Sequence, residues 1–459
     1  MIKKWNKSSR KGMITILLVI TMILTTIIPI WAEGIPIPDI SPWAMGTLNE
    51  GERYGIYSTE WYFDDFKGGI SEDRLEELLI NTGNKIGELE LNKKEDFTPI
   101  PSEGDRTRGD VVTRLYNVLA QYDIPVGKSA IQYMQEQKIL QGTAKGLNLD
   151  KICTTEEAVI FATRLIENTY NLMEAGSKGL AWKIEHNDNT IYFLGSIHVG
   201  NNKIYPIDKK LKEAFYQSDA LIVEANLFDQ SGGIEYFLEK ARYEDGVTLE
   251  DNISEETYEK MLKIFDLYDL PEEIYNQSKP WQIANDLAVI SSSSSENLEQ
   301  GAAAANLGID LYFLTNALLL NKPIIELEGI KYQADLFDGL SARFQEEYLN
   351  LVLDSILEPP TDEALDSSKQ LEKWLNQWKN GDIEGFTTSY TASNTESESE
   401  LTNMLFGQRD KNMAEKLVEI LESDEKGIYF VVVGAGHFVE DNTVFHHLRE
   451  KGYKVEVFK

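Results

Sequence analysis

The sequence predicts two architectures in one chain: an all-α helical domain over residues 33–175 and a mixed α/β (α+β) domain over residues 176–459. Two observations lead to this prediction. Apolar residues recur at helical spacing in the first region, whereas from residue 181 short apolar runs alternate with longer amphipathic stretches. A length of 459 residues is enough for two or three domains, and 42% hydrophobic residues exclude wholesale disorder.

The first 32 residues predict a signal peptide. Residues 1–12 are basic, residues 13–28 form an apolar run, and Ala32 offers a small side chain where a signal peptidase would cut. The alternative is an uncleaved anchor, because Ile30 is bulky for its place before the cut. The apolar run is, however, shorter than the about 20 residues of a membrane span. We therefore expect a secreted or cell-surface protein. It would contact the membrane only if its signal segment stayed uncleaved.

Composition excludes several classes of function. The net charge of −32 repels phosphate backbones, so a nucleic acid is not expected as a partner. The single cysteine, Cys153, excludes an intramolecular disulfide and any multi-cysteine metal site. Imidazole chemistry must come from five residues: His186, His198, His437, His446 and His447.

Residues 33–175 contain several amphipathic stretches with plausible helix starts. Ser71, Thr107 and Thr154 each precede an acidic residue in the first turn, which is typical of an N-cap that also stabilises the helix dipole. The charged stretch 91–107 predicts a linker between helical units. This pattern favours a bundle of short helices.

This helical region resembles a tandem of surface-layer homology repeats. Asp39-Ile-Ser-Pro-Trp43 is similar to the opening of one repeat, and Ala130-Ile-Gln-Tyr-Met134 is similar to the first helix of another. Such repeats bind anionic cell-wall polymers, so the resemblance implies that partner and a place at the surface of a Gram-positive bacterium. Only Arg108 keeps the arginine of the family's helix start, and a helical appendage that keeps the fold without the ligand is an equal alternative.

The α/β region is read as strands at its apolar runs and helices at the stretches between them. The expected strands are Thr190–Leu194, Ala220–Glu224, Pro323–Leu327, Ile428–Val433 and Lys454–Phe458. The expected helices are 208–217, 255–267, 311–320, 340–356, 368–379, 411–423 and 442–451. Two low-complexity stretches, Ser291–Ser295 and Thr391–Glu400, are expected to be surface loops.

Two segments of this region share one local design. A strand ends in glycine, and histidine follows three residues later, as Gly195 to His198 and as Gly434 to His437. Glycine allows a sharp turn or a close approach, and the carboxyl edge of an open α/β sheet is where ligands bind. The two imidazoles meet if their strands are neighbours, and Glu224 ends a third strand between them in sequence.

Two histidines and a carboxylate with an open position suit a catalytic divalent metal. Such a metal polarises a carbonyl and lowers the pKa of a bound water to about 7. The alternative for each histidine, judged from its sequence pattern alone, is a buried imidazole at a strand end whose hydrogen bonds are satisfied within the protein.

Residues 181–459 resemble the TraB/PrgY/GumN family, which includes the Tiki-type metalloproteases. The family is marked by two Gly-x-x-His motifs, and its first motif is matched by Leu194-Gly-Ser-Ile-His-Val199. Two positions depart from the pattern: the family's Arg-Asn is Arg409-Asp410, and Gly329 replaces a small hydroxyl residue. The other matches occur in family order at Glu224, Lys279-Pro280-Trp281, Gly308-Ile-Asp310, Lys322-Pro323, Leu327-Glu328, Gln333, Trp378, Gly381-Asp382, Arg409, Gly434–Phe438 and Leu448–Val455.

The resemblance implies a metal centre. His198 and His437 would bind the metal, Glu224 would be the third ligand or the general base, and Glu328 would be a fourth ligand or a partner of the ligands. Imidazole and carboxylate ligands accept Mn, Co or Zn, and the Tiki resemblance points to Mn or Co.

The remaining matched residues have more than one interpretation. Arg409 would stabilise an oxyanion or bind a substrate carboxylate, and the alternative is an ion pair with a nearby acid. Asp310 and Asp382 are expected to cap helices, and Trp281 is expected to fill the core. Surface or interface positions are expected for His186, His446 and His447.

The function expected from these residues is that of a secreted or cell-envelope metal-dependent hydrolase, a peptidase acting on peptides or proteins. A noncatalytic protein that sequesters a pheromone-like peptide at the cell wall is the alternative from another class. A structural wall protein and an ester hydrolase are also open, since the sequence does not separate amide from ester substrates.

Overall fold

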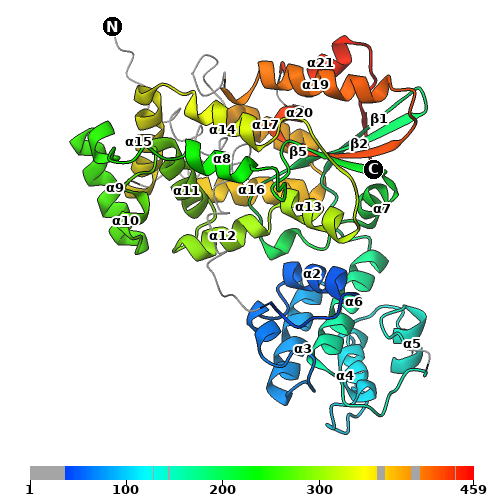
Figure 1. The fold of residues 1–459 in the computed structure, drawn as a ribbon. Helices are drawn as coiled ribbons and strands as arrows, with labels where there is room; N and C mark the ends of the chain where they lie inside the picture. Colours follow the sequence, from blue (N-terminus) through cyan, green and yellow to red (C-terminus); the bar gives the residue numbers. More distant parts are fainter. Residues whose placement is uncertain (1–36, 128, 143–144, 359–366, 394–403, 440) are drawn as a thin grey trace. The chain divides into compact units, whose positions relative to one another are not determined.

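The computed structural model describes residues 37–127, 129–142, 145–358, 367–393, 404–439 and 441–459. The chain separates into two compact units (Figure 1). One unit contains the described residues up to Ser177 together with the short segment Tyr205–Lys209. The other unit contains Lys178–Ile204 and Lys210–Lys459. The predicted signal peptide, residues 1–32, lies outside the described residues.

The first unit is built from helices, as its periodicity predicts. Backbone pairing in its described part is limited to isolated bridges such as the one between Gly69 and Thr154. The helices are α2 (Met45–Tyr54), η1 (Thr59–Phe63), α3 (Glu72–Gly87), α4 (Arg108–Ala120), α5 (Ala130–Glu136) and α6 (Thr155–Leu172).

Three of these helices begin at the caps expected from the sequence. The side chains of Ser71, Thr107 and Thr154 each accept a hydrogen bond from the backbone amide three residues later, and Thr154 forms a full capping box. The Ile70 amide donates to the Cys153 carbonyl across 2.9 Å just before two of these caps. Two helix starts that are far apart in sequence are therefore held together.

Arg108, at the start of α4, is buried inside this unit. Its Nε donates to the Leu147 carbonyl at 3.0 Å, one Nη donates to the Gln141 carbonyl at 3.0 Å, and the other forms an ion pair with Glu157. The guanidinium group thus joins three segments of the helical unit. Of these three partners, Glu157 carries the charge, and the other two are neutral backbone carbonyls.

The second unit is a mixed α/β structure around one six-stranded sheet, with the strand order β4-β3-β5-β2-β1-β6. The first four strands in that order are parallel, and β1 is antiparallel to β2 and to β6. The strands are β1 (Leu180–His186), β2 (Asn189–Ser196), β3 (Ala220–Val223), β4 (Ile324–Glu326), β5 (Ile428–Gly434) and β6 (Glu456–Val457). The five expected strands are therefore present, although β6 is shorter than its apolar run.

The sequence prediction did not include β1, which forms a hairpin with β2. Asn187 and Asp188 connect the strands, and both have positive φ, at 49° and 61°. A two-residue turn of this kind fits the twist of a hairpin, and Asn and Asp tolerate it better than most residues. The Asn-Asp pair before an apolar run was the signal for this strand.

Helices cover both faces of the sheet (Figure 1). On one face, the Phe430 ring of β5 packs against Phe215 of α7 (Lys209–Gln217) and Phe313 of α13 (Ile309–Leu319), with centroids 5.6 and 5.0 Å apart. On the other face, Phe193 of β2 packs against Phe445 of α21 (Val444–Glu450) at 5.2 Å. The two central strands therefore contribute aromatic residues to both faces, and a shift of register by one residue would turn these rings to the wrong face.

The helices of this unit include all seven that the sequence predicts, namely α7, α9, α13, α15, α16, α19 and α21. The bounds of the helical segments are η2 (Asn202–Ile204), α7 (Lys209–Gln217), α8 (Gly233–Lys240), η3 (Glu250–Asn252), α9 (Glu255–Tyr268), α10 (Glu272–Tyr275), α11 (Pro280–Ser292), α12 (Leu298–Asn306), α13 (Ile309–Leu319), α14 (Ile330–Asp338), α15 (Ala342–Leu357), α16 (Ser367–Asn380), α17 (Ile383–Ser393), α19 (Gln408–Leu421), α20 (Gly436–Val439) and α21 (Val444–Glu450).

The loop prediction at Ser291–Ser295 is wrong in part, because α11 continues to Ser292. This helix is buried on nearly all sides, and its polar residues Gln282, Asn285 and Asp286 are buried as well, so they do not mark a solvent-exposed face. Pro280 occupies its first turn, and Trp281 is fully buried with its ring stacked on Phe337 at 5.1 Å. The expected core role of Trp281 is confirmed. Most of the other predicted loop, Thr391–Glu400, lies outside the described residues.

Within the described ranges, no single helix is long and apolar enough to cross a membrane. The helices Glu299–Asn306 and Ile309–Leu319 reach that length and apolar composition only together, and they are bent by 64° where they meet.

Candidate functional site

Both histidines of the repeated motif follow neighbouring parallel strands. β2 and β5 pair so that Ser196 is opposite Gly434. His198 lies two residues beyond β2, and His437 lies in α20, which is separated from β5 by Ala435 alone. Both imidazoles are buried. The strands that precede the two histidines are neighbours, so both histidines lie at the same edge of the sheet, as the sequence analysis expects.

The two glycines of the motifs do not form the turns that the sequence predicts. Gly195 and Gly434 lie inside their strands. At Gly195, the position that a Cβ would take is 3.1 Å from the Cα of Ala435, so a side chain there would push the two strand ends apart. At Gly195 glycine therefore allows the close approach of the two strand ends, and both turns begin only after the strands end.

His198 is held by an aspartate from α13. Its Nδ1 lies 2.6 Å from Oδ2 of Asp310, and Oδ1 of the same carboxylate accepts a hydrogen bond from the Ser196 hydroxyl at 2.7 Å. The expectation that Asp310 caps a helix is wrong. The cap position of α13 is Gly308, and the carboxylate of Asp310 is directed to the strand end. Asp382, by contrast, accepts from the Gly385 amide at 2.9 Å and caps α17 as expected.

His437 has the same kind of partner from a different helix. Its Nδ1 lies 2.9 Å from Oδ1 of Asp410, and Oδ2 accepts from the backbone amide of Gly407 at 2.9 Å. Asp410 is the position at which the chain departs from the family's Arg-Asn pair. Sequence reasoning noted the departure but assigned it no role. The structure shows that this carboxylate joins the start of α19 to the second histidine.

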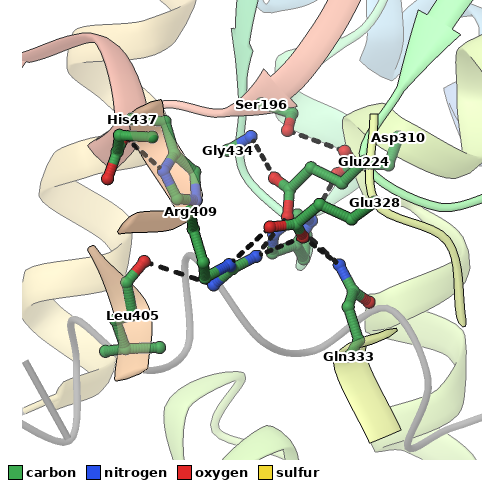
Figure 2. Close-up of polar contacts among 11 residues, drawn as sticks. Ser196, Glu224, Asp310, Glu328, Gln333, Leu405, Arg409, Gly434 and His437 are labelled. Atoms are coloured by element: carbon green, nitrogen blue, oxygen red, sulfur yellow. Dashed lines mark hydrogen bonds and ion pairs between the residues drawn. The ribbon is translucent and has the colours of Figure 1, made fainter. Parts of the chain in front are cut away.

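Between these two pairs lie two glutamates bridged by one arginine (Figure 2). Arg409 donates from Nε and from one Nη to the two oxygens of Glu328, each at 2.7 Å. The same Nη is 3.1 Å from Oε2 of Glu224, and the other Nη donates to the Leu405 carbonyl. Gln333 donates to both carboxylates at 3.3 and 3.2 Å. The ion-pair alternative for Arg409 is therefore the arrangement seen.

The backbone also joins the two glutamates. The Glu224 carbonyl accepts from the amides of Glu328 and Gly329, both at 2.9 Å, and Oε1 of Glu224 accepts from the Gly434 amide at 2.8 Å. Gly329 has a φ of 95°, a conformation that L side chains rarely adopt. Glycine adopts this conformation readily at the position where the family pattern has a small hydroxyl residue.

The charges of this cluster shift the pKa values of its members. Burial alone would raise the pKa of Glu328, but the Arg409 charge and its hydrogen bonds hold that pKa below its usual value. Burial would lower the pKa of Arg409, and the two glutamates raise it instead. Glu328 is therefore held as an ionised acceptor, and two carboxylates with one guanidinium leave a surplus negative charge.

The histidines fit a divalent metal better than the glutamates do. An aspartate on Nδ1 is the usual partner of a metal-binding histidine, because it leaves Nε2 to bind. Nε2 of His437 is buried and has no hydrogen-bond partner among the described residues. The oxygens of Glu224 and Glu328, however, are occupied by the contacts given above. In the part of the chain that the structure describes, no group of three or more His, Cys, Asp or Glu side chains is placed to hold a metal.

The structure thus brings together His198, His437, Glu224, Glu328 and Arg409, the five residues selected from the sequence, into one buried region of the sheet edge. Ser196, Asp310, Asp410 and Gln333 were missed as site residues. The remaining histidines lie elsewhere and pair with surface glutamates, His186 with Glu422 and both His446 and His447 with Glu450.

Three curated proteins illustrate what this chain is similar to. The uncharacterized protein YbaP of Escherichia coli (strain K12) is 32% identical over 142 residues, which are 31% of this chain and 49% of YbaP. A metalloprotease TIKI homolog of Amphimedon queenslandica is 25% identical over 320 residues, 60% of each chain. Metalloprotease TIKI2 of Xenopus tropicalis is 38% identical over 52 residues, which are 11% of this chain and 10% of TIKI2.

The matched segments thus cover about half the length of the curated relatives. No solved structure matches the chain. A sequence model of the TraB/PrgY/gumN family matches residues 180–457, which include the sheet, both histidines and the arginine-bridged glutamates. The resemblance of residues 33–175 to surface-layer homology repeats stays a prediction. Since the family model spans more than half of its residues, the chain belongs to the TraB/PrgY/gumN family.

Proposed function

We propose that this protein is a metal-dependent hydrolase that cleaves peptide bonds. One observation carries the proposal: two buried histidines at the ends of neighbouring parallel strands each present Nδ1 to an aspartate. Family membership and the similarity to a metalloprotease TIKI homolog support the reaction class. The substrate is a peptide or protein segment.

His198 and His437 would hold the metal through Nε2. The metal would polarise the scissile carbonyl and lower the pKa of its bound water. Asp310 and Asp410 keep both imidazoles oriented. Arg409 holds the pKa of Glu328 below its usual value, and Glu224, the carboxylate nearest the end of β5, is the candidate for proton transfer. Arg409 already uses its bidentate edge on Glu328, so its part is to order the two carboxylates, and substrate carboxylate binding by that edge is excluded in this arrangement.

A noncatalytic peptide-binding protein is the second candidate. The observation that favours it is the absence, among the residues placed in the structure, of an assembled set of three metal ligands. In that case the buried acidic cluster would recognise a basic group of a sequestered peptide.

We also propose that the protein is exported by residues 1–32 and acts outside the cell or at the cell wall. The sequence pattern supports export, and the repeat resemblance supports attachment to an anionic wall polymer. The burial of Arg108 within its own unit supports the alternative that the helical unit keeps its fold without that ligand.

The deciding experiment is the metal content of the purified protein after dialysis with Mn, Co and Zn, followed by cleavage of a peptide library. We expect stoichiometric metal and cleavage in the wild type, and loss of both in His198→Ala/His437→Ala. His186→Ala is the matched control, because that histidine lies outside the site. Metal-free protein that retains peptide binding would favour the second candidate, and cleavage that survives the double substitution would overturn the assignment.

A further inference from the structure

We propose that Asp310 and Asp410 are positioning residues that fix the proton of His198 and His437 on Nδ1, and that only Asp410 must be a carboxylate to do so. The importance of the tautomer rests on the proposed function, since a metal or a proton acceptor at Nε2 needs that nitrogen unprotonated. The hydrogen-bond argument itself rests on the second partner, or anchor, of each aspartate. This anchor is the Ser196 hydroxyl for Asp310 and the Gly407 amide for Asp410, and the two differ in chemistry.

Each aspartate is held at both oxygens. Asp310 faces His198 with Oδ2 and the Ser196 hydroxyl with Oδ1. Asp410 faces His437 with Oδ1 and the Gly407 amide with Oδ2. Both carboxylates are buried, and Asp410 has no exposed surface. A carboxylate that accepts from Nδ1 selects the tautomer with the proton on Nδ1.

The anchors differ in what they can accept. A serine hydroxyl donates or accepts by rotating, whereas a backbone amide only donates. Asp310→Asn can therefore keep its oxygen on Nδ1–H of His198 and donate its NH2 to the Ser196 oxygen. The proton of His198 stays on Nδ1, and the Ser196 oxygen accepts from the asparagine NH2, while the Ser196 hydroxyl proton loses Asp310 as its acceptor.

Asp410→Asn has no such solution. Its single oxygen is required by the Gly407 amide, and the NH2 then points to Nδ1 of His437, which must give up its proton to accept. The reverse orientation places two buried donors, the asparagine NH2 and the Gly407 N–H, against each other. The substitution therefore moves the proton of His437 to Nε2 and removes the lone pair from the nitrogen that faces the site.

The test is the tautomer of each histidine in the full-length, metal-free protein. Ring 15N shifts and long-range couplings of histidine-labelled protein report which nitrogen carries the proton. The five histidines are assigned by single substitutions, and the spectra are recorded at about pH 8.5, two units above the ordinary histidine pKa of about 6.5.

We expect Nδ1–H for His198 and His437 in the wild type and in Asp310→Asn, and Nε2–H for His437 in Asp410→Asn. Affinity for Mn or Co alone, measured by calorimetry, should fall about 10–100-fold in Asp410→Asn. It should fall less in Asp310→Asn, which loses the carboxylate charge beside His198 but keeps the tautomer. If the aspartates had a purely structural role, neither substitution would change a histidine tautomer, and the two variants would bind metal with the same affinity.

The wild-type spectrum keeps the proposal open to refutation even if a variant fails to fold. A proton on Nε2 of either histidine in the wild type, or Nδ1–H of His437 surviving in folded Asp410→Asn, overturns it. If the tautomers are as stated but the protein binds no metal and cleaves no peptide, the proposed function fails and the positioning roles stand.

Discussion

Each unit of this protein buries one arginine near a helix start, and the two arginines are used differently. In the helical unit, Arg108 is matched to two neutral carbonyls and one carboxylate, Glu157, so its charge is balanced. In the α/β unit, Arg409 lies between two buried carboxylates and one carbonyl, so negative charge is left over. The comparison teaches that burial of a charge does not by itself mark a site, whereas an unbalanced buried cluster does.

The largest expected effect comes from removing the cation of the unbalanced cluster. Arg409→Met leaves Glu224 and Glu328 buried without a counter-charge, which should lower the free energy of unfolding of the α/β unit by about 3–5 kcal/mol. Urea unfolding monitored by the tryptophans of this unit measures the loss. Arg409→Met with Glu328→Gln should recover part of it, and no recovery would contradict the charge argument.

Asp286 extends the comparison to a buried carboxylate whose partners are neutral. Burial raises its pKa to about 8, and hydrogen bonds from Gln282 and Tyr275 lower it only in part. Since the folded-state pKa lies above the unfolded value, the stability is present at low pH and is lost as the pH rises from about 4 to about 8. The slope is at most about 1.4 kcal/mol per pH unit for one proton.

Asp286→Asn should remove this slope, and the measurement is the free energy of unfolding at pH 5 to 9. The variant should be less sensitive to pH than the wild type and more stable than it at the alkaline end. Equal slopes in both proteins would show that Asp286 is ionised throughout this range.

Arg108→Met should have a smaller effect than Arg409→Met. The partner Glu157 is partly exposed and can be hydrated after the change, so the main loss is of the hydrogen bonds to two carbonyls, about 1–3 kcal/mol. Thermal unfolding of the helical unit measures it. If Arg108→Met cost as much as Arg409→Met, the distinction between the balanced and the unbalanced arginine would be lost.

The smallest effect is expected at a helix cap of the helical unit. Thr154→Ala removes the capping box at the start of α6 and should cost about 1 kcal/mol. Ser71→Ala, at a cap without the reciprocal glutamate contact, is the matched comparison and should cost less. Denaturant unfolding of both variants ranks the two caps.

The sequence was informative where the pattern was local. Helix caps at Ser71, Thr107 and Thr154, and the strands that lead to His198 and His437, follow from spacing and turn chemistry. Asp310 and Asp410 could not be assigned in this way, because each lies in a helix start whose acidic residue has an ordinary local explanation as a cap or a dipole partner. Only the tertiary contacts show that both carboxylates face an imidazole.

The position of β5 has a consequence for the timing of folding. β5 (Ile428–Gly434) lies between β3 and β2 in the sheet, yet it follows β2, β3 and β4 in sequence. A nascent chain that has not reached residue 434 lacks the strand that joins the two halves of the sheet, and it lacks His437 as well. Contacts of such long sequence separation form late, so the site cannot assemble on an incomplete chain. Synthesis of β5 and α20 therefore joins the two halves of the sheet and supplies the second histidine of the candidate site in one event.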